Sequence, residues 1–82
     1  MRHLLIAGFA RGTTADEIRQ ALEKAGVPVT EIRIEMGNRE GRDVALVGVD
    51  TDETGIRVLA ERIDGFVWKG HRLQAEHTLL FE

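Results

Sequence analysis

The sequence predicts an α+β fold in which a four-stranded antiparallel sheet carries two helices on one face, in the order β-α-β-β-α-β. Two kinds of observation lead to this prediction. Two segments have apolar residues at helical spacing, and four short segments either alternate between apolar and polar residues or are continuously apolar. Right-handed crossovers would place the first and third strands side by side in the middle and leave the other face open.

The strand that is predicted most clearly covers residues 42–49 and is expected at the centre of the sheet. Valine and leucine alternate here with small residues, between a glycine-containing loop and an Asp-Thr-Asp cluster. Because side chains alternate along a strand, two sets point to opposite faces. These sets are Ala45, Val47 and Val49, expected in the core, and Val44, Leu46 and Gly48, expected on the ligand-facing side.

Three further strands are predicted at residues 3–9, 29–36 and 72–77. On the first strand, the residues expected on the face away from Leu4 and Ile6 are His3, Leu5 and Ala7. On the last strand, those expected to point outward are Arg72, Gln74 and Glu76. Residues 78–82 follow as an apolar tail, so the domain is expected to span residues 1–77.

Both helices carry start and stop signals. The first is expected to begin at Thr14, which forms a capping box with Glu17, and to end at Gly26. The second is expected to be capped by Asp50 or Thr51 and to end at residues 64–65. Its apolar stripe is Ile56, Leu59, Ala60 and Ile63. This order of elements is the ferredoxin-like, or split βαβ, arrangement.

The composition limits the classes of function that this chain can have. The 82 residues are enough for one small domain, and a net charge of −3 argues against strong non-specific binding to phosphates. The chain has no cysteine, so a cytoplasmic location is the default expectation. No apolar run is long enough to span a membrane, and no signal-peptide pattern is present, so no membrane partner is expected.

Four stretches resemble the RNA-recognition motif (RRM). Residues 4–9, Leu-Leu-Ile-Ala-Gly-Phe, are similar to its first-strand signature, and residues 13–18 to the opening of its first helix. Residues 42–49 fall where its third-strand signature belongs, and residues 63–73 resemble the stretch between its second helix and last strand. This resemblance covers nearly the whole chain and implies the ferredoxin-like fold.

The resemblance also implies binding of single-stranded RNA, which that family achieves by stacking bases on aromatic residues of the central strands. Here Arg42 keeps the basic position and Ala45 the small one. The positions at which the family has aromatic residues hold Leu5, Val44, Leu46 and Val49. Since stacking contributes about 1–3 kcal/mol per base, RNA binding is expected to be weak.

The aliphatic residues Leu5, Val44 and Leu46 support a second interpretation. A contiguous apolar surface is typical of an interface, so this face could bind a protein partner or a second copy of the chain in a homodimer. Alternatively, the tail residues Leu79, Leu80 and Phe81 could fold back over it. The sequence leaves the chain's oligomeric state, monomer or homodimer, open.

The other residues proposed to bind nucleic acid or a partner are polar or charged. They are His3, Arg33, Arg39, Arg42, Arg72, Gln74 and His77. Glutamates at neighbouring positions of the same strands are expected to pair with much of this charge.

No catalytic residue, metal or cofactor is predicted. The chain has neither serine nor cysteine, and no carboxylate pair stands beside a base. His3 and His77 could meet if the first and last strands are neighbours, but two histidines without a carboxylate or thiolate are little evidence for a metal. The protein is therefore expected not to be an enzyme.

Overall fold

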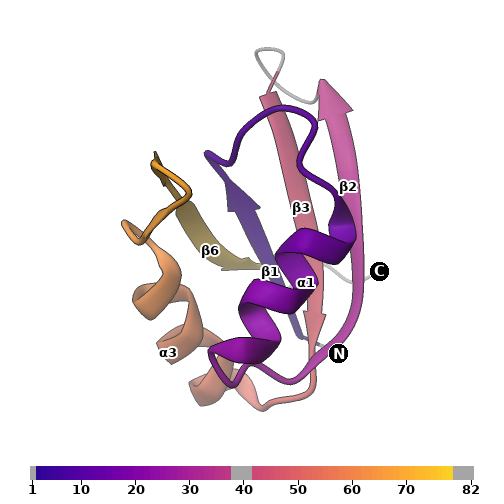
Figure 1. Cartoon of the computed structure of the whole chain (residues 1–82). Helices are drawn as coiled ribbons and strands as arrows, with labels where there is room; N and C mark the ends of the chain where they lie inside the picture. The colour runs from indigo at the N-terminus through magenta and orange to yellow at the C-terminus, as the bar shows by residue number, and fades with distance from the viewer. Residues whose placement is uncertain (1, 38–41, 79–82) are drawn as a thin grey trace.

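The computed structural model describes residues 2–37 and 42–78. The four-stranded sheet consists of β1 (Arg2–Ala7), β2 (Val29–Gly37), β3 (Arg42–Val49) and β6 (Gln74–Thr78), in the spatial order β2-β3-β1-β6 (Figure 1). All three pairings are antiparallel. The predicted α+β ferredoxin-like arrangement is confirmed, with β1 and β3 at the centre.

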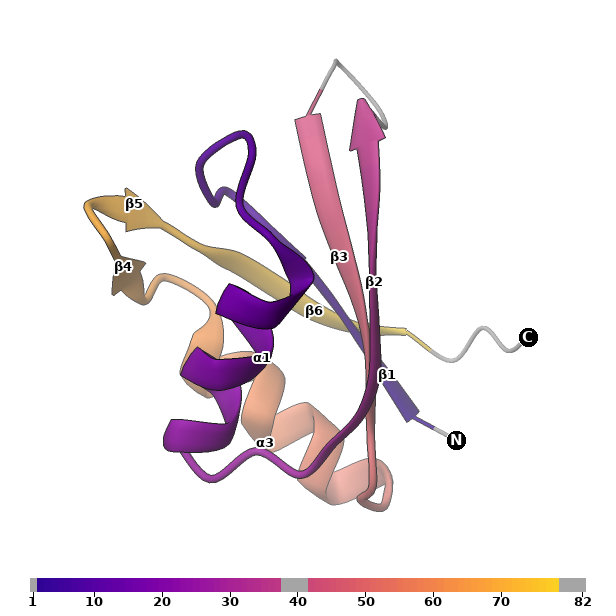
Figure 2. The ribbon, with the colours of Figure 1, turned by 45° about the vertical axis from the view of Figure 1, so that its right-hand side comes forward.

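Both helices lie on one face of this sheet, which is clearest where the sheet is seen nearly edge-on (Figure 2). They are α1 (Ala15–Lys24) and α3 (Glu53–Ile63). The core between helices and sheet contains Leu4 and Ile6 of β1, the predicted trio Ala45, Val47 and Val49 of β3, and Ile56 of α3, each at most 1% exposed. Aliphatic side chains of this kind stabilise a fold by leaving water.

The caps of the helices explain where they begin and end. Thr14 caps α1 and forms the predicted capping box with Glu17, and Gly26 follows the helix with φ +89°. The expected cap of the second helix is wrong by one or two residues. Asp52, and not Asp50 or Thr51, is the N-cap of α3, where its Oδ1 accepts a hydrogen bond of 2.7 Å from the N–H of Gly55.

The last strand also starts later than predicted. Arg72 belongs to a separate two-stranded hairpin of β4 (Val67–Trp68) and β5 (His71–Arg72), where it pairs with Val67. Buried Leu73 breaks the strand because its N–H donates to Phe66 and its C=O accepts from Gly65, both at 2.8 Å. The last strand of the main sheet is therefore β6, which ends at residue 78, one residue later than the predicted strand.

Asp64 joins the end of α3 to the outer edge of the sheet. It is the C-cap residue of α3, and its Oδ1 accepts a hydrogen bond of 3.0 Å from the backbone N–H of Ala75 in β6. A side chain thereby satisfies a backbone donor on an edge strand, a group that otherwise stays free to pair with another chain.

Two expectations from the sequence fall outside the described part of the chain: the position of Arg39 and the course of Leu79, Leu80 and Phe81. Neither described helix is long and apolar enough to cross a membrane.

Candidate binding face of the sheet

The sheet face that no helix covers, called the open face below, consists of side chains from all four strands. The register brings together three rows across the strands β2, β3, β1 and β6. The rows are Glu35–Val44–Ala7–Gln74, Arg33–Leu46–Leu5–Glu76 and Glu31–Gly48–His3–Thr78. The predicted sides of β1 and β3 are therefore confirmed.

The centre of the open face is aliphatic. Leu5 of β1 pairs directly with Leu46 of β3, and Ala7 pairs with Val44. All four are half-buried, although no helix covers them. Three of the residues proposed as ligand contacts, Leu5, Val44 and Leu46, thus form one contiguous patch across the two central strands.

Charged residues flank this patch on the two edge strands. The middle row carries exposed Arg33 on one side and exposed Glu76 on the other. Arg33 has no ion-pair partner within the described segments. The exposed Glu31 and Glu35 lie on either side of Arg33 along β2, so the edge of the open face is mainly acidic where the structure describes it.

Gly48 creates a gap in the third row that a histidine and a glutamate close. His3 and Glu31 lie on the strands to either side of Gly48, and their side chains meet with 3.6 Å between Nε2 and Oε2. Gly48 has no side chain to separate them, and it is itself buried. The proposed ligand contact His3 is therefore already engaged with Glu31.

Two of the proposed binding residues lie away from the open face. His77 pairs with Leu4, a core residue, and so belongs to the helix-facing side of β6. The first and last strands are neighbours, as the sequence suggested, but they carry His3 and His77 on opposite faces, so the two histidines do not meet. Arg72 is exposed, but it lies in the β4–β5 hairpin and not in the main sheet.

The remaining proposed residues differ in where the structure places them. Gln74 is exposed on the open face opposite Ala7. The backbone of Arg42 begins β3, and its side chain lies outside what the structure describes. Val49, an aromatic position of the RRM pattern, is 1% exposed on the helix side, so it cannot contact a ligand on the open face.

Asp64 also lies in this region, although the sequence predicts for it only a position at the end of the second helix. With Leu5, Ala7, Gln74, Ala75 and Glu76 it lines a shallow hollow of about 390 Å³ where β1 meets β6. Alternation along β6 predicts the sides of Gln74 and Glu76. The approach of Asp64 depends on the path of the chain after α3, for which the sequence carries no periodic signal.

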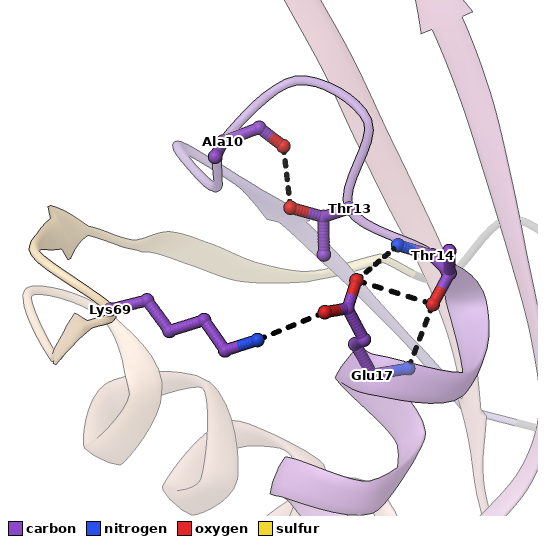
Figure 3. A network of polar contacts seen from close by, with 5 residues as sticks. All are labelled: Ala10, Thr13, Thr14, Glu17 and Lys69. Atoms are coloured by element: carbon purple, nitrogen blue, oxygen red, sulfur yellow. Dashed lines mark hydrogen bonds and ion pairs between the residues drawn. The ribbon is translucent and has the colours of Figure 1, made fainter.

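Among residues 2–37 and 42–78, no cluster of three or more His, Asp or Glu side chains could hold a metal ion. The polar network in Figure 3 instead serves the fold. Glu17 accepts hydrogen bonds from the N–H of Thr14 at 2.9 Å and from Nζ of Lys69 at 2.9 Å. The hydrogen bond from the Thr14 N–H and the nearby positive charge of Lys69 hold the pKa of the Glu17 carboxyl below its usual value.

No family model and no curated protein matches this chain. Solved structures do. The RRM3 domain of Mip6 superposes with a TM-score of 0.76 at 16% identity, over 93% of this chain and 91% of that one. The Rna15 RRM with bound RNA (GU) gives a TM-score of 0.71 at 14% identity, over 95% of this chain and 83% of that one.

The N-terminal three RNA-binding domains of the yeast splicing factor Prp24 give a TM-score of 0.71 at 24% identity, over 90% of this chain. The chain spans 31% of that structure's length. Taken with the strand order, the two helices on one face and the open opposite face, these likenesses show that the chain has the fold of the RNA-recognition motif.

Proposed function

We propose that this chain is a non-enzymatic binding module that holds single-stranded RNA weakly on its open face. The observation that carries the proposal is the RRM fold with β1 and β3 adjacent and covered by neither described helix, so that Leu5 and Leu46 lie side by side at the centre. A single strand laid across these two strands would meet the aliphatic patch with its bases. Arg33 would be available to a phosphate.

The similar structures support this proposal. The Prp24 structure contains RNA-binding domains, and the Rna15 RRM holds bound RNA (GU). Both resemble this chain in the part that presents the open face, since the superpositions cover at least nine tenths of it.

Weak binding follows from the chemistry of the face. Leucine and valine offer apolar contact but no flat π surface on which a base can stack. Glu31, Glu35 and Glu76 at the edge repel phosphates, and a chain with a net charge of −3 adds no long-range attraction. We therefore expect low affinity that depends little on base identity and, because few phosphates are neutralised, falls only modestly with salt.

Restoring aromatic side chains tests the proposal. The variant Leu5→Phe/Leu46→Phe should bind a short random-sequence single-stranded RNA more tightly, because each stacked base contributes about 1–3 kcal/mol. Amide-shift titration should then place the largest shifts on β1 and β3. Val58→Phe is the matched control, since Val58 is exposed on α3 and adds an aromatic residue away from the open face.

The RNA proposal fails if the double variant and the control bind RNA equally, or if RNA shifts only residues outside β1 and β3. Wild-type shifts on β1 and β3 that persist at moderate salt would support it further, because purely electrostatic contacts weaken with salt.

The aliphatic patch favours a second candidate function, the binding of a protein or of a second copy of the chain. Leu5, Val44 and Leu46 are contiguous, and the flanking carboxylates suit a protein surface better than a phosphate backbone. Sedimentation of the wild type and of Leu46→Glu distinguishes the two. A dimer that Leu46→Glu dissociates would place self-association on the open face and remove the room for RNA.

A further inference from the structure

A second apolar site lies on the opposite side of the molecule from the open face. It is a cavity of about 210 Å³ between α1, α3 and the β4–β5 hairpin, called the helix-side pocket below. Its lining includes Ile18 of α1, Leu59 of α3 and Trp68 of β4. Figure 2 shows the hairpin standing beside the ends of both helices, away from the open face.

Apolar side chains at this pocket remain in contact with water. Phe66 lines it and is 56% exposed, and the next residue, Val67, is 61% exposed. These are two of the three large exposed hydrophobic residues that the structure describes. Adjacent exposed apolar residues beside an apolar cavity are typical of a surface that a ligand covers.

One charged side chain lines the pocket. Arg62, in the last turn of α3, is exposed and has no ion-pair partner within the described segments. Its position complements the negative end of the helix dipole, which accounts for a basic residue there. That interaction leaves the guanidinium's planar hydrogen-bond donors available for a carboxylate.

The hairpin wall of the pocket is held in place before any ligand arrives. Nζ of Lys69 lies 2.9 Å from Oε2 of Glu17 in α1 (Figure 3). The same atom lies 5.0 Å from the ring centroid of Trp68. Lys69 and Gly70 both have positive φ, 51° and 80°, which closes the tight turn of the hairpin. A preformed wall lowers the entropic cost of binding.

The size of the pocket limits what can enter. An apolar cavity of about 150 Å³ in another protein accommodates benzene, so 210 Å³ is enough for one aromatic ring. It is smaller than the roughly 300 Å³ at which pockets for whole small molecules begin. We propose that the helix-side pocket binds one aromatic side chain of an acidic segment of a partner protein, with a neighbouring carboxylate of that segment on Arg62.

Trp68 allows a direct test because it is the only tryptophan in the chain. The probe is the blocked pentapeptide Gly-Asp-Phe-Asp-Gly, followed through the emission of Trp68 and through amide shifts. Two analogues isolate the two parts of the proposal, one with Asn for both Asp residues and one with Ala for Phe. We expect the acidic phenylalanine peptide to bind most tightly, and the alanine peptide to leave Trp68 unchanged.

Two variants locate the site. Arg62→Gln should weaken binding of the acidic peptide by up to about fivefold, the upper limit for an exposed ion pair, and leave binding of the Asn peptide unchanged. Ala25→Leu places a larger side chain on the pocket lining, at an exposed position, and should weaken both phenylalanine peptides. Val58→Ala is the control, since Val58 is exposed on α3 but does not line the pocket.

The proposal is overturned if the phenylalanine peptides leave Trp68 emission and the shifts of α1 and α3 unchanged at millimolar concentration. If Arg62→Gln weakens binding of the acidic peptide and of the Asn peptide equally, Arg62 does not bind the peptide carboxylate. Amide spectra of each variant show whether it is folded, so loss of binding is not confused with loss of structure. RNA binding on β1 and β3 is measured separately, so either function can fail alone.

Discussion

Gly48 lacks a side chain at the position on β3 where the neighbouring strands bring His3 and Glu31 toward each other. Their 3.6 Å contact closes the third row of the open face, so we expect the proposed ligand to contact the other two rows. A glycine inside a strand generally weakens it. Here it allows a pair of side chains from β1 and β2 to meet across β3.

Glu17 combines a capping role with a link to the β4–β5 hairpin, and this gives a pH prediction. The Thr14 N–H and Lys69 favour its carboxylate and lower its pKa from the ordinary 4.5. Its contribution to stability is therefore complete above that value and is lost as the pH falls through the lowered pKa. Glu17→Gln should reduce the free energy of unfolding at pH 7, because glutamine cannot pair with the Lys69 charge.

Urea unfolding at pH 7 and at pH 3 measures this effect, and the difference between wild type and variant should shrink at the lower pH. Asp16→Asn is the control, since it removes a carboxylate from the first turn of the same helix that has no ion-pair partner among the residues that the structure describes. A difference that stays constant between the two pH values would contradict the assignment.

Among the elements, β3 and α1 are predicted best from sequence because their signals are local. An alternating run places Val47 in the core, and a threonine followed three residues later by a glutamate caps α1. The cap of α3 is less certain because Asp50, Thr51 and Asp52 are consecutive capping residues. Local pattern cannot choose among them.

The β4–β5 hairpin could not be predicted in the same way. Backbone hydrogen bonds of Leu73 with Gly65 and Phe66 close it, and its two-residue strands are too short to show alternation in the sequence. The helix-side pocket is even harder to predict from the sequence, because its lining residues come from β1, α1, α3 and the hairpin. The open face, by contrast, follows from alternation along the strands, and the same alternation places His77 of β6 on the opposite side from Gln74 and Glu76.

The amphipathic stripe of α3 gives a prediction at this scale. Ile56 is 1% exposed against the sheet, whereas Val58, two residues along the same helix, is 46% exposed. Ile56→Ala should lower the free energy of unfolding by about 2–5 kcal/mol, because it leaves a cavity in the core. Val58→Ala should change it by less than about 0.5 kcal/mol.

Chemical unfolding of both variants checks this prediction. Equal losses would mean that α3 does not pack on the sheet by the Ile56 face. Val58→Ala also serves as the folded control for the peptide experiments, so its stability is needed there.

For the whole molecule, the two proposed sites lie on opposite sides of one core. The open face is formed by side chains such as Leu5 and Leu46, and the helix-side pocket lies beyond the buried layer that includes Leu4 and Ile6. A segment bound in the pocket leaves the open face uncovered. RNA and the acidic phenylalanine peptide should therefore bind together, each with its affinity unchanged within about twofold.

A titration of RNA into the peptide-saturated domain measures this independence, with Trp68 reporting the peptide and the shifts of β1 and β3 reporting RNA. Mutual displacement would mean that the two ligands share a surface, and would contradict the separation of the sites. A large coupling without displacement would instead mean that the core transmits a change between its two sides.

The contact between Asp64 and the N–H of Ala75 bears on how the protein behaves at high concentration. An exposed strand edge with free donors is a template on which further chains can add, and β6 is an edge of this sheet. The carboxylate occupies one of these donors and places a negative charge along the edge. We therefore expect solubility to depend in part on a residue whose position at the end of α3 suggests only that a helix stops.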